Sequence, residues 1–256
     1  MTEECSGRGE GGPVKQQYDS SVEAFNRDAV NRGSYAYTDN SRLSSRMATQ
    51  TTRELVARVG KFTGQSVLDV GCGDGYYTIG YWDAVGPASM VGIDAAESAV
   101  DVANASRRER PIRFHSGDAH QLPYPDGSFD VALLQSILHH DSDPGRTVRE
   151  AFRVAERVLI HEPNGYNLGL KVIERVSPYH REHKEKSYTL ARITRWIEEA
   201  GGEVEHVEYA GFVPMFSPDW LARGMKAVEP LVEYIPGVNR LACAVYVVLS
   251  RRLHAR

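Results

Sequence analysis

The chain has 256 residues, 41% of them hydrophobic and 25% charged, and its formal net charge is −4. These values are ordinary for a globular protein, and the length favours a single domain with insertions. A negative net charge argues against broad nucleic-acid binding, which depends on a basic surface, although it is compatible with a local basic pocket for an anionic small molecule.

Neither end of the sequence predicts a membrane segment. Residues 1–15 are rich in Glu, Gly and Ser and lack an apolar signal core, so we expect a disordered N-terminus. The longest apolar run, Leu241–Leu249, is too short to span a bilayer and predicts a buried strand. Three cysteines, Cys5, Cys72 and Cys243, lie far apart without metal-ligand spacing, which predicts no disulfide and no metal site and suits the cytoplasm.

The N-terminal part of the chain lacks the regular pattern of the later residues. Residues 16–48 interleave tyrosines with arginines and match neither the helical nor the strand period. We expect short helices there that cap the rest of a single domain over residues 16–256. From Thr51 to Val59, apolar residues recur at helical spacing, which predicts a helix that stops at Gly60.

Short apolar runs then alternate with helical segments. The predicted strands are Ser66–Val70, Met90–Asp94, Ile112–Ser116, Phe129–Leu134 and Arg157–His161. The predicted helices are Tyr76–Trp82, Glu97–Arg107, Arg146–Ala155 and Leu190–Ala200. This alternation is typical of a doubly wound parallel sheet with helices on both faces.

The C-terminal part departs from that alternation. Val204–Ala210 and Cys243–Leu249 predict two further strands, separated by an amphipathic helix near Trp220–Val232. We therefore expect an α/β fold with a doubly wound, seven-stranded, mostly parallel sheet and one antiparallel strand near the C-terminus. Residues 163–187 do not fit the pattern, and because so long a connection is usually functional, we expect a lid-like insertion.

The strongest motif is the run Val67–Gly75, in which a strand ends near Asp69 and three glycines at alternate positions open a helix. Glycine permits a tight turn and lets a ligand approach the backbone. The spacing differs from the dinucleotide fingerprint, and Asp69 would repel a pyrophosphate but could hold the cationic amino group of a methionine-like ligand. A plain strand-to-helix turn is the alternative.

These residues resemble the class I S-adenosylmethionine-dependent methyltransferases, and the resemblance runs from about Val67 to Ala200. It implies S-adenosylmethionine as the cofactor. The resemblance assigns the methionine end to Asp69, Gly71, Cys72 and Gly73, the ribose to Asp94 and Ala95, the adenine to Asp118 and Ala119, the sulfonium to Gln135, and a covering position to Tyr37. Asp94 could instead be only a helix N-cap.

The resemblance is to the branch that methylates small molecules. Gln135–Leu138 lacks the Asn/Asp-Pro-Pro-aromatic motif of the nucleic-acid amino-methylating branch, and Leu138–Asp141 lacks the glutamate pair of protein-arginine enzymes. We expect methyl transfer to an oxygen or a nitrogen of a small polar metabolite, in secondary-metabolite or sugar biosynthesis. No nucleic-acid or membrane partner is expected, and a homodimer is left open.

Two histidine pairs are candidate acceptor-side residues. His139 and His140 come after the fourth predicted strand, at the edge where ligands bind, and a hydroxyl acceptor needs a base such as imidazole. They could instead only shape the start of the next helix. The second group is expected in the lid against the acceptor and comprises Tyr179, His180, Arg181 and His183.

The second histidine group also allows other interpretations. His180 and His183 have spacing that would share a helix face, but a third and a fourth metal ligand are not evident. Arg181 could bind an anionic group, or the segment could be a solvated charged face. Two rival functions use the same sheet, a nicotinamide-dependent oxidoreductase and a non-catalytic cofactor-binding module. Asp69 and the glycine spacing oppose the first, whereas the histidine pairs and the long insertion favour an enzyme over the second.

Overall fold

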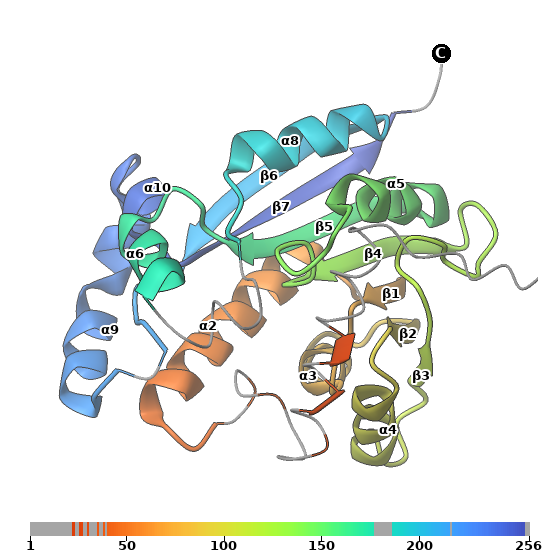
Figure 1. Cartoon of the computed structure of the whole chain (residues 1–256), viewed down its shortest axis with the longest axis horizontal. Coiled ribbons are helices and arrows are strands. Elements are labelled where there is room, and N and C mark those ends of the chain that lie inside the picture. Colours follow the sequence, from red (N-terminus) through yellow and green to blue (C-terminus); the bar gives the residue numbers. More distant parts are fainter. Residues whose placement is uncertain are drawn as a thin grey trace, which may run out of the picture.

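Seven strands form a single sheet in the order β3-β2-β1-β4-β5-β7-β6 (Figure 1). The structure is a computed structural model that describes residues 22–23, 26–27, 30, 35, 38, 40–176, 186–215 and 217–253. The strands are β1 Ser66–Val70, β2 Ser89–Asp94, β3 Arg113–Ser116, β4 Phe129–Gln135, β5 Ala155–Pro163, β6 Gly202–Ala210 and β7 Val245–Arg252.

The predicted sheet topology is confirmed. β7 runs antiparallel to β5 and to β6, whereas the other neighbouring strands pair in parallel. The parallel strands β1, β2, β4 and β5 therefore end at one edge of the sheet, and the loops that leave these ends lie side by side. In open α/β sheets this carboxyl edge is where ligands bind.

Helices cover both faces of the sheet (Figure 1). Their bounds are α2 Leu43–Gly60, α3 Tyr76–Val85, α4 Glu97–Ser106, α5 Pro144–Val154, α6 Leu168–Val176, α8 Leu190–Glu199, α9 Asp219–Tyr234 and α10 Val238–Ala242. Successive strand residues point to opposite faces. Val131 and Leu133 accordingly pack in one core with α2, α3 and α4, whereas Ala132 and Leu134 pack in the other with α5 and α8.

Two expectations about element boundaries were wrong. α2 begins at Leu43 instead of near Thr51, so residues 43–48 form the first turns of this helix. Its first turns bury Ser44, Ser45 and Thr49, so that a search for apolar periodicity misses them. Leu241 was expected in a buried strand, but it lies in α10 and is 58% exposed.

Candidate active site

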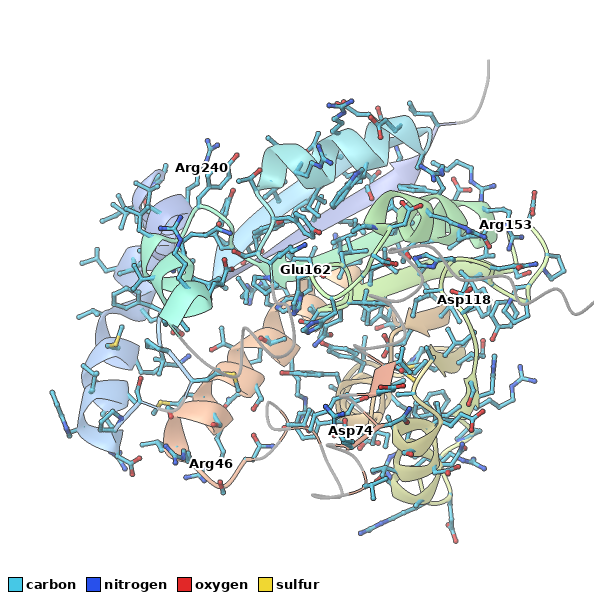
Figure 2. The ribbon with its side chains drawn as sticks, in the orientation of Figure 1. Arg46, Asp74, Asp118, Arg153, Glu162 and Arg240 are labelled. Atoms are coloured by element: carbon cyan, nitrogen blue, oxygen red, sulfur yellow. The ribbon has the colours of Figure 1, made fainter. Side chains whose placement is uncertain are left out.

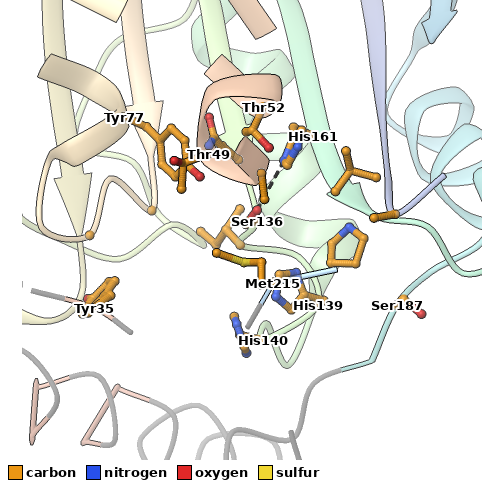
Figure 3. Close-up of a pocket in the computed structure, with 18 of the residues that line it drawn as sticks. Tyr35, Thr49, Thr52, Tyr77, Ser136, His139, His140, His161, Ser187 and Met215 are labelled. Carbon is orange, nitrogen blue, oxygen red and sulfur yellow. Dashed lines mark hydrogen bonds between the residues drawn. The ribbon is translucent and has the colours of Figure 1, made fainter. Parts of the chain in front are cut away.

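A cavity of about 650 Å³ opens at the carboxyl edge of the sheet (Figure 3). One side is formed by the loops after β1, β2 and β4, where glycines and polar groups predominate. The other side is formed by α6, α9 and the segment 211–215, where apolar side chains predominate. The cavity therefore has a polar half and an apolar half.

The glycine turn after β1 forms one wall of the polar half. Gly71 and Gly73 have positive φ values of 78° and 52°. A Cβ at Gly71 would lie 2.7 Å from the Ile137 side chain, and one at Gly73 would lie 2.6 Å from the Tyr35 ring. No side chain fits at either position, and both glycines line the cavity, so this turn contributes backbone to its wall. Cys72, between them, also lines the cavity.

Asp94 ends β2 and lines the cavity next to Ala95. Its Oδ2 accepts a hydrogen bond from the Gly73 N–H at 2.8 Å, and its Oδ1 accepts one from the Ala96 N–H at 2.8 Å. Burial raises the pKa of Asp94. The carboxylate thus joins the glycine turn to the start of α4, and each oxygen retains a lone pair for a ligand.

Asp69, which was expected to contact the ligand, is not among the side chains that line the cavity. Side-chain alternation in β1 directs it to the face that α3 covers, where the Thr78 hydroxyl donates to its Oδ2 at 2.5 Å. Asp69 is 2% exposed, and burial raises its pKa to about 7. Its Oδ1 has no hydrogen-bond partner among the residues that the structure describes.

Of the other predicted cofactor residues, some line the cavity and one points to solvent. Ala119 and Gln135 line the cavity, whereas the Asp118 side chain is 52% exposed and its Oδ1 accepts from the His120 N–H at 2.8 Å (Figure 2). The Tyr81 hydroxyl donates to Gln135 Oε1 at 2.5 Å. The Gln135 Nε2 is buried and, within the described part of the chain, has no acceptor. An unused buried donor therefore stands at the cavity wall.

His139 lies against a buried glutamate that the sequence prediction missed. Its Nδ1 is 2.6 Å from Oε2 of Glu162, which comes from the end of β5, next to β4 (Figure 2). The Leu138 N–H donates to the other carboxylate oxygen at 2.8 Å. Glu162 is fully buried, and this burial raises its pKa to about 8. When ionised, Glu162 accepts the Nδ1 proton and leaves the lone pair on Nε2.

Two further histidines line the same cavity (Figure 3). The His140 ring centroid is 3.9 Å from that of His139, so both predicted histidines lie at the site. His161, which was not predicted, approaches Ser136 with its Nδ1 3.3 Å from Oγ. Burial lowers the pKa of His161 to about 4, so this imidazole is neutral at neutral pH and only weakly basic.

The apolar half of the cavity was also missed by the sequence prediction. Its side chains come from distant segments and include Leu170, Ile173, Phe212, Val213, Met215 and Met225. The signal for them was weak, because isolated apolar residues on helices and in loops do not by themselves predict a pocket. Glu162 could have been found by asking which polar residue ends the strand beside β4.

Several predicted residues lie outside the described part of the chain. They are Tyr37, Tyr179, His180, Arg181 and His183. Within the ranges described above, no group of three or more His, Cys, Asp or Glu side chains could hold a metal ion. None of the helices in these ranges has the length and apolar character needed to cross a membrane.

Residues 68–158 match the protein family described as a methyltransferase domain. A demethylmenaquinone methyltransferase from Lactococcus lactis is 37% identical over 101 residues, 38% of this chain and 40% of that protein. A 27-O-demethylrifamycin SV methyltransferase from Amycolatopsis mediterranei is 34% identical over 123 residues, 46% of this chain and 44% of that protein. The chain therefore spans less than half the length of either curated relative.

The fold is also found in a solved structure. Magnesium protoporphyrin IX methyltransferase from Synechocystis PCC 6803, with S-adenosylhomocysteine bound, aligns with a TM-score of 0.55. The alignment covers 96% of this chain and 90% of that chain at 15% identity. At this identity the likeness shows the fold alone.

Proposed function

Because residues 68–158 form a class I S-adenosylmethionine-dependent methyltransferase domain, we propose that this chain transfers the methyl group of that cofactor to an oxygen of a small molecule. The observation that carries the proposal is the His139–Glu162 pair, which stands in a cavity with one polar and one apolar half. The bound cofactor supplies an electrophilic methyl group on a sulfonium. The chain supplies alignment, exclusion of water and a base.

The polar half fits the cofactor. Gly71 and Gly73 present bare backbone, which suits close approach of the amino-acid end. Asp94 offers a carboxylate that can accept both hydroxyls of a ribose. Gln135 offers an unused amide donor, which can bind the cofactor carboxylate. Asp69 would support the glycine turn indirectly, because its hydrogen bond with Thr78 holds α3 in place.

His139 is the proposed base. A hydroxyl must lose its proton as the methyl group arrives, and a positioned imidazole can take it. Glu162 fixes the ring and stabilises the imidazolium that forms. His161 is a poorer candidate, because burial lowers its pKa to about 4. His140, whose ring is tilted against that of His139, is the second candidate.

The apolar half indicates the kind of acceptor. Leu170, Phe212 and Met225 and their neighbours would bury a carbon skeleton, whereas a sugar would lose its hydration there without replacement hydrogen bonds. This supports a hydroxyl on an apolar skeleton over the small polar metabolite expected from the sequence. The relative that methylates 27-O-demethylrifamycin SV is named for an oxygen acceptor. The test is release of S-adenosylhomocysteine with naphthols, phenols and monosaccharides as probes. Turnover with monosaccharides alone would contradict this acceptor class.

Asp94→Ala should weaken S-adenosylmethionine binding by roughly 1–3 kcal/mol, because ribose hydroxyls would lose a charged acceptor. Calorimetric titration measures the change. Asp130→Ala is the matched control, since Asp130 holds Ser66 at the far end of β1 and does not line the cavity. An unchanged dissociation constant in Asp94→Ala would mean that this carboxylate only holds the glycine turn and α4.

Glu162→Gln should lower turnover and remove its rise with pH. The wild-type rate should rise as the pH passes about 8, because Glu162 must ionise before it accepts the Nδ1 proton of His139. A glutamine keeps the shape but cannot ionise. Rates measured across this range test the idea, and a pH profile that is identical in the variant would contradict it.

The same substitution should flatten the pH dependence of stability. The pKa of Glu162 is raised from an ordinary value of 4.5 to about 8, so its contribution to folding is complete at low pH and is lost as the pH rises through that interval. The free energy of unfolding should therefore fall by up to about 1.4 kcal/mol per pH unit in the wild type and by less in Glu162→Gln. Urea unfolding at several pH values measures both slopes.

A further inference from the structure

Exposed apolar side chains are concentrated beside the cavity. Of the twelve large apolar side chains exposed within the described ranges, ten lie on α6, α9, α10 or the turn between the last two. Figure 1 shows these helices together at one end of the molecule. The face that they form, here called the α6–α9–α10 face, includes Leu168, Trp220, Val228, Leu231, Tyr234 and Leu241. Such a concentration marks an interaction site.

The helix α9 shows how this face is built. Trp220, Leu231 and Tyr234 lie eleven and three residues apart, so they share one side of the helix, and they are 75%, 62% and 84% exposed. The opposite side buries Ala222, and Met225 lines the cavity. One helix therefore contributes to the apolar half of the cavity and to the apolar outer face.

Acidic and basic side chains on the three helices are distributed unequally between the inner side and the outer face. Two of the three acidic side chains of α9 turn inward, where Glu229 accepts from the Phe212 N–H at 2.8 Å and Glu233 accepts from the Gly211 N–H at 2.8 Å. The exposed charged residues of α6, α9 and α10 are Arg175, Arg223 and Arg240, with Asp219 as the acidic exception. Arg240 lies beside α10 at the upper edge of this region in Figure 2. The face is locally basic in a chain whose net charge is −4.

We propose that the α6–α9–α10 face docks onto the surface of an anionic lipid bilayer. Aromatic and aliphatic side chains flanked by arginine are the composition of helices that lie in the interface of such a membrane. A second copy of this chain is a poorer occupant, because a two-fold contact through this face would place two sets of the three arginines in one interface. The consequence for the acceptor rests on the proposed function: an apolar acceptor dissolved in the bilayer would enter the cavity from this side.

Vesicle flotation of the full chain tests the proposal. The wild type should float with phosphatidylcholine vesicles that contain about 30% phosphatidylglycerol, and more weakly with phosphatidylcholine alone. The double variant Trp220→Ser, Leu231→Ser should lower the bound fraction by roughly tenfold, because it removes two inserted side chains. Leu253→Ser is the matched control, since Leu253 is 53% exposed after β7 and outside the face.

A charge variant measures the electrostatic contribution to vesicle binding. Arg223→Glu should reduce binding to the anionic vesicles and leave binding to phosphatidylcholine nearly unchanged, whereas Arg149→Glu on α5, also exposed, should change neither. Circular dichroism and S-adenosylmethionine affinity should match the wild type in every variant. If the double variant fails to fold, Tyr234→Ser replaces it.

Three results would overturn the proposal. They are absence of wild-type flotation, equal flotation of the wild type and the apolar variant, and a dimer in sedimentation velocity that the apolar variant dissociates without any effect on vesicles. Vesicle binding does not depend on methyl transfer. Failure of the proposed function and failure of this inference are therefore separate outcomes.

Discussion

Gly73→Val should abolish S-adenosylmethionine binding. The turn after β1 holds Gly73 at a φ of 52°, and a Cβ there would lie 2.6 Å from the Tyr35 ring. A β-branched residue is strained at this φ, and its side chain would displace the Tyr35 ring, which lines the same cavity. The same displacement would disturb the hydrogen bond from the Gly73 N–H to Asp94. Loss of calorimetric heat on titration is the expected result.

A control variant separates the loss of the cofactor site from the effect of backbone strain. Gly86 has a φ of 65° and no atom within 4 Å of an added Cβ, and it ends α3 away from the cavity. Gly86→Val therefore carries a similar conformational cost, on the order of 1–2 kcal/mol, without obstructing the turn. It should bind the cofactor with wild-type affinity. If Gly73→Val also bound with wild-type affinity, the glycine turn would not be the cofactor site.

His139→Ala should lower turnover by about 10²–10⁴-fold with little change in cofactor affinity. The loss results from removing the group that takes the acceptor proton and that Glu162 orients through Nδ1 at 2.6 Å. His140→Ala should have a smaller effect, because it leaves the His139–Glu162 pair in place. Single-turnover rates with a responsive hydroxyl probe separate this chemical step from binding.

His206→Ala is the control for the histidine variants, because His206 lies on β6 with its side chain 51% exposed. It should retain the wild-type rate. Wild-type turnover in His139→Ala, in His140→Ala and in the double variant would end the general-base proposal. The family assignment would remain, since alignment alone can suffice when the acceptor is already nucleophilic.

The sheet and the glycine turn could be predicted because their signals are local. β1 was predicted with its observed bounds, since five residues of strand pattern are succeeded at once by the glycine run. The family resemblance, which rests on the same run and on Asp94, is confirmed over residues 68–158. The start of α2 could not be predicted in the same way, because its buried face carries hydroxyls and not apolar side chains.

The parts of the site that were missed depend on contacts between distant segments. Glu162 is 23 residues from His139 in the sequence, and only the pairing of β4 with β5 brings them together. Asp69 lies in β1 as expected, and its contact with Thr78 of α3 depends on side-chain alternation in that strand. The apolar half is assembled from α6, α9 and the 211–215 segment, whose proximity results from the tertiary fold.

A crystal structure of this chain with S-adenosylhomocysteine would show where the cofactor binds. We expect the ligand in the polar half, with its ribose at Asp94, its amino-acid end at Gly71 and Gly73, and its sulfur toward His139. The apolar half should remain open for an acceptor. Binding outside this cavity, or with the sulfur turned away from His139 and the apolar half, would mean that His139 and the apolar half do not form the methyl-transfer site.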